Sequence, residues 1–125
     1  MFTPKLYILP PAQRRLWDEL EQTPQEFVLY GGTALALRLG HRHSEDFDFF
    51  SNLFFAPESF RRRIPYLQTA EVTQVNANTL TAIVDRGGPV KVSFFGGLAL
   101  NRVRDPDVTE DNRIQLASLL DVAAT

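Results

Sequence analysis

Two aspartates separated by one residue are the clearest candidates for chemistry in this 125-residue chain. Asp46 and Asp48 lie in the run DFDFF, whose alternation of polar and aromatic residues predicts a strand. A strand places both carboxylates on one face, roughly 6.6–7 Å apart, and turns Phe47 and Phe49 towards the core. Neighbouring carboxylates repel each other, and a bound divalent cation removes that cost. Oxygen ligands favour Mg²⁺ or Mn²⁺ over zinc, and such ions can flank a reacting phosphate.

A pair of glycines upstream, Gly31 and Gly32, predicts a place for phosphate. The pair follows the apolar run EFVLY at 26–30, a predicted strand, and precedes TALALRLG at 33–40, a predicted helix. Glycine lets the backbone approach a ligand, and the N–H groups at a helix N-terminus attract anions. Thr33 could cap this helix or offer its hydroxyl to phosphate. The spacing matches neither the GxxxxGK[ST] nor the GxGxxG phosphate loop.

Each of these motifs alone has an ordinary structural explanation. An acidic pair can be the outer face of a half-exposed strand, and two glycines can form a tight turn. Their combination is more specific, because it places a phosphate cradle beside a metal site. Phosphoryl transfer requires that layout, since its catalysis depends on positioning and charge neutralisation.

Polar residues between the two motifs are secondary candidates. Arg42 could pair with phosphate or form a structural salt bridge to the aspartates. Ser44 is expected to hydrogen-bond the loop backbone, because no His–Asp pair is placed to make it a nucleophile. His41 and His43 are interpreted as polar loop residues, since two histidines among oxygen ligands are a weak zinc signal.

Basic residues elsewhere have two interpretations. Lys91 lies in the predicted strand VKVSFF and shares a face with Ser93 and Phe95, from which it could reach a phosphate or simply face solvent. The run 61–63 is three arginines that could contact an RNA backbone. On a predicted helix these three point in different directions, which favours a solvated surface over a shared patch.

The order of predicted elements indicates an α+β domain with a mixed sheet flanked by helices. Residues 1–10 and 101–112 are expected to be irregular. The predicted helices span 11–21, 33–40 and 57–66 and begin again near 117, and the predicted strands span 26–30, 46–50, 70–77, 79–85 and 90–95. A strand–helix–strand start is followed by a meander of strands. One domain covers the whole of 1–125.

Composition excludes several classes of protein. The formal net charge is −2 and the pI is about 5.6, so a broad basic surface for nucleic acid is absent. The chain has no cysteine, which rules out disulfides and thiolate metal sites. No apolar run approaches the ~18 residues of a membrane span, and the N-terminus lacks signal-peptide features. The expected location is cytoplasmic, without membrane contact.

The run YGGTALALRLGHRHSEDFDFF at 30–50 strongly resembles the AbiEii/AbiGii toxin family of nucleotidyltransferases, within the polymerase-beta-type superfamily. A Gly-Gly or Gly-Ser turn followed by an acidic–hydrophobic–acidic strand marks that superfamily. Arg42 and Ser44 ahead of Asp46 are typical of the AbiEii-like branch. The resemblance continues more weakly through VKVSFF and ASLLDVAAT. It implies the polymerase-beta-type nucleotidyltransferase fold.

The resemblance also implies an activity and a set of site residues. In this family an acceptor hydroxyl attacks the α-phosphate of a nucleoside triphosphate in line and releases pyrophosphate. Asp46 and Asp48 would be the catalytic and metal-binding residues, with Mg²⁺ or Mn²⁺ as cofactor. The expected nucleotide-binding residues are Gly31, Gly32, Thr33, Arg42, Ser44 and Lys91.

Acceptor and partners follow from the same resemblance. Related toxins are thought to modify transfer RNA or otherwise consume nucleotides, and a cognate antitoxin neutralises them. We therefore expect a transferase acting on an RNA such as tRNA, with a cognate antitoxin as a candidate partner. Exposed apolar surface on the last predicted helix makes a homodimer a further candidate. Two alternatives stay open: a non-catalytic module that binds a nucleotide or a protein, and a nucleotidyltransferase acting on a small molecule.

Two departures from the family pattern bear on catalysis. Ser93 stands where superfamily enzymes often carry a third carboxylate, and serine cannot act as a carboxylate base. Asp85, on the preceding predicted strand, is a candidate replacement. The family's closing helix carries an Asp, matched by Asp121, and then a Lys that would fall just past Thr125. We expect the chain to be the N-terminal part of a longer protein whose helical part follows.

Overall fold

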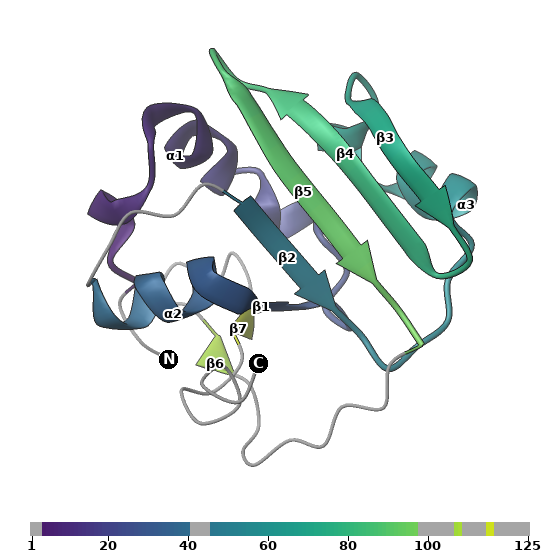
Figure 1. The fold of residues 1–125 in the computed structure, drawn as a ribbon, viewed down its shortest axis with the longest axis horizontal. Coiled ribbons are helices and arrows are strands. Elements are labelled where there is room, and N and C mark those ends of the chain that lie inside the picture. The colour runs from purple at the N-terminus through teal and green to yellow at the C-terminus, as the bar shows by residue number, and fades with distance from the viewer. Residues whose placement is uncertain (1–3, 41–45, 98–106, 109–114, 117–125) are drawn as a thin grey trace.

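A mixed β-sheet forms the frame of the computed structural model, which describes residues 4–40, 46–97, 107–108 and 115–116. Its strands are β1 Val28–Tyr30, β2 Asp46–Phe50, β3 Glu71–Asn76, β4 Thr79–Asp85, β5 Pro89–Phe95, β6 Asp107–Val108 and β7 Gln115–Leu116. The seven strands lie in the order β3-β4-β5-β2-β1-β7-β6 (Figure 1). The expected mixed sheet is therefore present.

The structure describes three α-helices, of which the first and the third are shorter than the patterns predict. They are α1 Pro11–Trp17, α2 Gly31–Leu39 and α3 Pro57–Arg63, joined by 3-10 turns at Leu6–Ile8, Leu20–Gln22 and Pro65–Leu67. The predicted helix 57–66 ends at Arg63 because a residue before proline avoids the helical conformation. Ile64 is extended accordingly, with φ −113° and ψ 109°. The predicted helix 11–21 is likewise divided into α1 and a 3-10 turn.

Helix α2 begins directly after β1, without an intervening loop. Gly31 is its first residue, and Gly40 follows its end in the left-handed conformation, with φ 63°. The Gly40 N–H donates to the carbonyl of Ala36 at 2.6 Å. This confirms the predicted strand–glycine–helix order and the glycine at the helix end.

Strand directions bring residues far apart in the sequence into register. Strand β1 pairs with β2 antiparallel, although the strand–helix–strand order was also compatible with a parallel pair. Strand β2 pairs with β5 in parallel, with Asp48 level with Ser93. Strands β3, β4 and β5 form the predicted antiparallel meander. Residues from both halves of the chain thus meet on β2 and β5.

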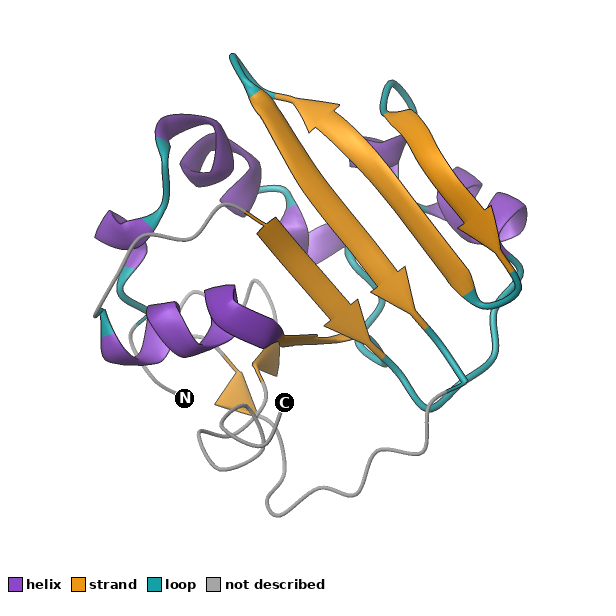
Figure 2. Cartoon of the chain, in the orientation of Figure 1, coloured by secondary structure: helices purple, strands orange, loops and turns teal. Residues whose placement is uncertain are grey.

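Helices cover one face of this sheet and leave the other open over β2, β4 and β5 (Figure 2). Aromatic rings fill the covered side. Phe60 of α3 lies 4.9 Å from Phe94 of β5, and Trp17 of α1 lies 6.4 Å from Phe47 of β2, measured between ring centroids. All four side chains are buried. The uncovered face is therefore available for a ligand.

The C-terminal part of the prediction needs correction. Asp107 and Val108 form β6, inside the stretch expected to be a charged loop. Leu116, expected in the apolar stripe of the last helix, lies in β7 and pairs with Leu29 of β1. The remainder of that predicted helix lies outside the described residues. No helix among the described residues is long and apolar enough to cross a membrane.

Candidate active site

The two aspartates share the open face of β2, as the alternation predicts. Asp46 is exposed and Asp48 half-buried, whereas Phe47 and Phe49 between and after them are fully buried. Burial of these two rings fixes the register of the strand, since a slip of one residue would place carboxylates in the core. The core therefore determines the direction of both carboxylates.

The electrostatics of the pair are unfavourable for two charged carboxylates. Burial raises the pKa of the Asp48 carboxyl, repulsion from Asp46 raises it further, and Lys91 lowers it. The net direction is upward, so the positive charge of Lys91 does not compensate for the burial of Asp48 and its repulsion from Asp46. A divalent cation bound to oxygen ligands would supply that charge.

Strand β5 brings Lys91 and Ser93 beside the aspartates. Lys91 pairs with Asp46 and is exposed, while Ser93 pairs with Asp48 and is 2% exposed. The Ser93 hydroxyl lies 3.2 Å from the hydroxyl of Thr81 on β4. Ser93 thus takes the place next to Asp48 that a third carboxylate would need, and its hydrogen bond holds it within the sheet.

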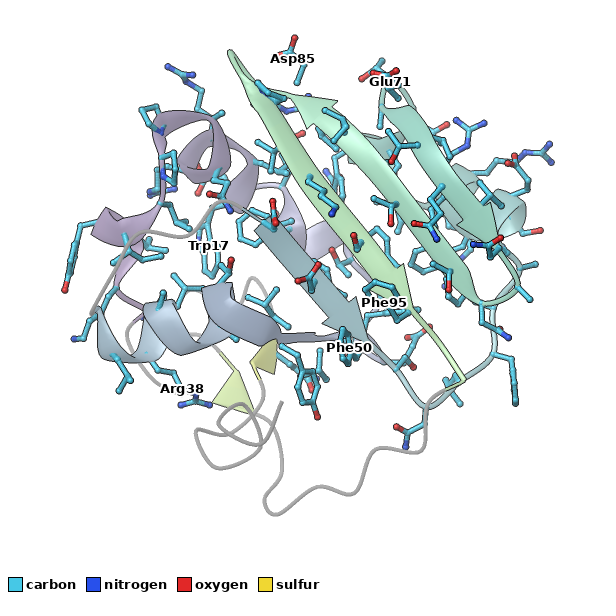
Figure 3. All side chains as sticks on the ribbon, viewed as in Figure 1. Trp17, Arg38, Phe50, Glu71, Asp85 and Phe95 are labelled. Carbon is cyan, nitrogen blue, oxygen red and sulfur yellow. The ribbon has the colours of Figure 1, made fainter. Side chains whose placement is uncertain are left out.

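Asp85 does not replace the missing carboxylate. It pairs with Pro89 at the far end of β4 from the Ser93 position (Figure 3). Its Oδ1 accepts hydrogen bonds from the N–H groups of Gly87 and Gly88, at 3.0 and 3.1 Å. Asp85 therefore stabilises the turn between β4 and β5.

The glycine pair lies beside Asp48 because Tyr30, the residue before it, pairs with Asp48 across β1 and β2. The first N–H groups of a helix have no partner within the helix and can bind an anion. The sheet therefore places the N-terminus of α2 next to the aspartates, as the expected phosphate cradle requires.

Thr33 has a structural role that sequence reasoning did not foresee. Its hydroxyl donates to the backbone carbonyl of Asp46, and the residue is 3% exposed. The N-cap residue of α2 is Tyr30, whose side chain makes no capping hydrogen bond, and Thr33 is the third residue of the helix. The cap, one of the two roles considered for Thr33, is therefore wrong, while its role in nucleotide binding stays a prediction. Instead, Thr33 ties the first turn of α2 to the start of β2.

Arg42 and Ser44, with His41 and His43, lie outside the described residues. Within the described ranges no cluster of three or more His, Cys, Asp or Glu side chains could hold a metal. Among these residues the proposed metal site therefore depends on the Asp46–Asp48 pair.

A row of aromatic side chains continues the site face beyond the aspartates. The ring of Phe50 stacks on Tyr30 at 5.1 Å and meets Phe95 edge-on at 5.2 Å. Figure 3 shows Phe50 and Phe95 close together towards the ends of β2 and β5. The alternation that places Asp46 and Asp48 on one face also places Phe50 there, so the sequence contained this signal.

The arginine run 61–63 is remote from the aspartates. It belongs to α3, whose Phe60 packs on the covered face of the sheet. Arg61 forms an ion pair with Glu58 of the same helix at 3.7 Å. This placement agrees with a surface role for the run.

Comparisons with known proteins agree with this geometry. A family model described as the nucleotidyl transferase AbiEii toxin of a type IV toxin–antitoxin system matches residues 15–116. An uncharacterized protein of Aquifex aeolicus (strain VF5) is 35% identical over 100 residues, covering 78% of this chain and 47% of that protein. The chain thus spans about half the length of this curated relative.

A crystal structure of an H. pylori protein described as a candidate nucleotidyltransferase matches with a TM-score of 0.63 at 16% identity. The match covers 88% of this chain and 53% of that one, and it shows the expected fold. The family match includes the glycine pair, both aspartates and Ser93. The chain therefore belongs to the AbiEii family of nucleotidyl transferase toxins.

Proposed function

We propose that this chain holds the nucleoside triphosphate and metal of an enzyme that transfers a nucleoside monophosphate to an acceptor hydroxyl. The observation that carries the proposal is the position of Asp46 and Asp48, on an open sheet face beside the N-terminus of α2. Family membership supplies the reaction class.

The glycine pair and Lys91 would bind phosphate, and the aspartates would bind the metal. The backbone N–H groups of Gly31 and Gly32 would bind phosphate oxygens, and exposed Lys91 adds a positive charge on the same face. Asp46 and Asp48 would hold Mg²⁺, or Mn²⁺ in its place, because their oxygens suit these ions. When bound, the ion would neutralise phosphate charge and orient the α-phosphate for in-line attack.

The bond changes follow from this reaction class. The acceptor oxygen forms a bond to the α-phosphorus, and the bond from that phosphorus to the bridging oxygen breaks, so that pyrophosphate leaves. The proton of the acceptor hydroxyl passes to solvent, since Ser93 has no carboxylate to receive it. Arg42 and Ser44 remain proposed nucleotide ligands by resemblance alone.

We propose RNA as the acceptor, with transfer RNA first, because the chain resembles toxins thought to modify tRNA. The family's description as part of a type IV toxin–antitoxin system supports a cognate antitoxin as partner. A cytoplasmic location and a homodimer belong to the same proposal.

Ser93 favours a second candidate function, a module that binds nucleotide without transferring it.

A transfer assay distinguishes the two functions. The full-length protein should be incubated with Mg²⁺ and each α-labelled nucleoside triphosphate, first with total RNA and then with small hydroxyl compounds. We expect label in RNA, lost when a chelator is added. Nucleotide binding without any transfer would instead support the binding module, and label only on small compounds would support a small-molecule transferase.

A further inference from the structure

A loop beyond the ends of β2 and β5 carries two exposed apolar side chains. The loop follows Phe50, the last residue of β2, and leads to α3. Within it Leu53 is 57% exposed and Phe54 is 79% exposed, which makes Phe54 the most open of the large apolar side chains that the structure describes. Contact between a phenyl ring and water is unfavourable, so a ligand that covered this ring would be stabilised by the contact.

Hydrogen bonds hold this loop against the end of β5. The Ser51 N–H donates to the Phe95 carbonyl and the Gly97 N–H donates to the Leu53 carbonyl, both at 2.9 Å. The Leu53 N–H donates to the Ser51 hydroxyl at 3.0 Å. A backbone tied in this way is formed before a ligand arrives, so binding at Phe54 costs little ordering of the protein.

Gly97 supports the ring of Phe54 from one side. A Cβ atom at Gly97 would lie 2.9 Å from two carbons of that ring, which is closer than packed carbon atoms approach. The ring therefore rests directly against the Gly97 backbone, which has the left-handed conformation with φ 67°. Because most of the Phe54 surface is exposed, at least one face of the ring is open to solvent.

Asn78, in the turn between β3 and β4, places a hydrogen-bond donor beside this ring. Its Oδ1 accepts the Phe55 N–H at 2.9 Å, which determines the orientation of the amide group. Its Nδ2 lies 3.6 Å from the same Cβ position at Gly97 that the Phe54 ring adjoins. Among the residues that the structure describes, this nitrogen has no hydrogen-bond partner. The open ring and a free N–H donor therefore lie on either side of Gly97.

A ring face and a donor together indicate the class of ligand. Nucleobases stack on aromatic side chains and carry hydrogen-bond acceptors at their edges. A free nucleotide fits poorly, because small-molecule sites bury roughly 70–90% of their ligand and this ring is open. A base within a longer chain needs no such enclosure, since the other contacts of the chain keep it nearby. The site therefore fits an unpaired base of a nucleic acid.

The loop lies at the same end of the sheet as the aromatic row of the candidate active site. Phe50 and Phe95 end β2 and β5 and lie close together there (Figure 3). Phe50 is two residues from Asp48 on the same face, which is roughly 6.6–7 Å, and Phe54 lies in the loop that follows. A single strand with its terminal hydroxyl at the aspartates would therefore pass Phe50 and Phe95 before reaching Phe54.

We propose that Phe54 stacks on an unpaired base of an RNA acceptor, with the Asn78 amide donating to the edge of that base. The proposal rests on the proposed function, because the acceptor of that reaction supplies the RNA. A partner protein is less well matched, since two side chains offer far less than the ~800 Å² that each partner of a stable protein complex buries. Phe54 and Asn78 thus belong to an acceptor-binding surface beside the site for the metal and triphosphate.

The test measures binding of a labelled hairpin RNA with a short unpaired 3′ end to the full-length protein. Phe54→Leu keeps an apolar side chain and removes the flat ring, whereas Phe54→Trp keeps a ring. We expect Phe54→Leu to weaken binding at least about fivefold, the effect of losing one base stack, and Phe54→Trp to bind at least as tightly as the parent. Tyr7→Leu, at another ring that is 69% exposed, is the matched control and should leave the affinity unchanged.

A second RNA separates stacking from other effects of the substitutions. It is the same hairpin with the bases of its unpaired end removed. Parent and Phe54→Leu should bind this abasic RNA equally, because no base remains to stack. Asn78→Asp keeps an oxygen for the Phe55 N–H and removes the donor. Its added charge repels both RNAs alike, so we expect a larger loss with the base-containing RNA than with the abasic one.

The proposal is overturned if Phe54→Leu and the parent bind the hairpin RNA equally, or if the loss is as large with the abasic RNA. It is also overturned if Phe54→Leu weakens only Mg²⁺-dependent ATP binding or only binding of the cognate antitoxin, because the ring would then belong to another surface.

Failure of the proposed function gives a different result. In that case Mg²⁺-dependent ATP binding is absent from the parent, while RNA binding still depends on Phe54. If only the stacking inference is wrong, Mg²⁺-dependent ATP binding and transfer to RNA are the same in Phe54→Leu and in the parent.

Discussion

Asp48 of β2 and Ser93 of β5 lie level with each other in neighbouring parallel strands, on the open face of the sheet. Ser93 is almost fully buried, and its hydroxyl lies 3.2 Å from that of Thr81. The residue beside Asp48 is therefore a neutral group held in the sheet. Two carboxylates, rather than three, define the acidic part of the site among the described residues.

Replacing Ser93 with aspartate should make protein stability depend on the metal. A third carboxylate beside Asp48 would be buried next to like charge, so Ser93→Asp should lower the free energy of unfolding by about 1–3 kcal/mol without metal. Mg²⁺ should recover most of that loss. Thermal unfolding with and without Mg²⁺ measures both effects. Ser93→Ala, which adds no charge, is the control. An equal loss of unfolding free energy for Ser93→Asp with and without Mg²⁺ would contradict a metal site beside Asp48.

Removing the charge of Asp48 should stabilise the metal-free protein at neutral pH. The folded-state pKa of Asp48 is raised, chiefly by burial, so the folded protein binds a proton more tightly than the unfolded chain. The contribution of Asp48 to the free energy of unfolding therefore falls as the pH rises from about 4, the pKa of an aspartate in the unfolded chain, through the raised pKa of the folded state. Above the raised pKa the loss persists. Asp48→Asn should raise the unfolding temperature at pH 7 and have less effect near pH 4. A lower unfolding temperature at pH 7 would contradict this account.

The hydroxyl of Thr33 should matter for stability as well as for binding. Thr33→Val keeps the shape but loses the bond to the Asp46 carbonyl, which should cost about 0.5–1.5 kcal/mol in denaturant unfolding. Thr33→Ser keeps the hydroxyl and is the matched control. Mg²⁺-dependent triphosphate binding should weaken in Thr33→Val, because the start of β2 loses its tie to α2. Equal stability of the two variants would show that the bond contributes nothing.

Local patterns predicted the parts of the site that single strands and turns determine. The alternation of DFDFF fixed the directions of Asp46 and Phe47, because strand geometry leaves only two faces. Gly40 ended α2 as predicted, because its left-handed conformation suits glycine. Such features depend on a few neighbouring residues and need no knowledge of the fold.

Features that depend on pairing between distant segments were missed. The antiparallel pairing of β1 with β2 leaves no local signal, and the strand at Leu116 exists through its pairing with Leu29. The partner of Ser93 is known only when β4 and β5 are aligned.

The most direct test of the central claim is calorimetric binding of ATP to the full-length protein, with and without Mg²⁺. Asp46→Asn combined with Asp48→Asn keeps the side-chain shapes and removes both charges. Asp18→Asn, at an exposed aspartate of a surface ion pair, is the matched control. We predict Mg²⁺-dependent binding in the parent and in Asp18→Asn, weakened at least about tenfold in the double variant. Unchanged Mg²⁺-dependent affinity in the double variant would contradict the assignment of this site.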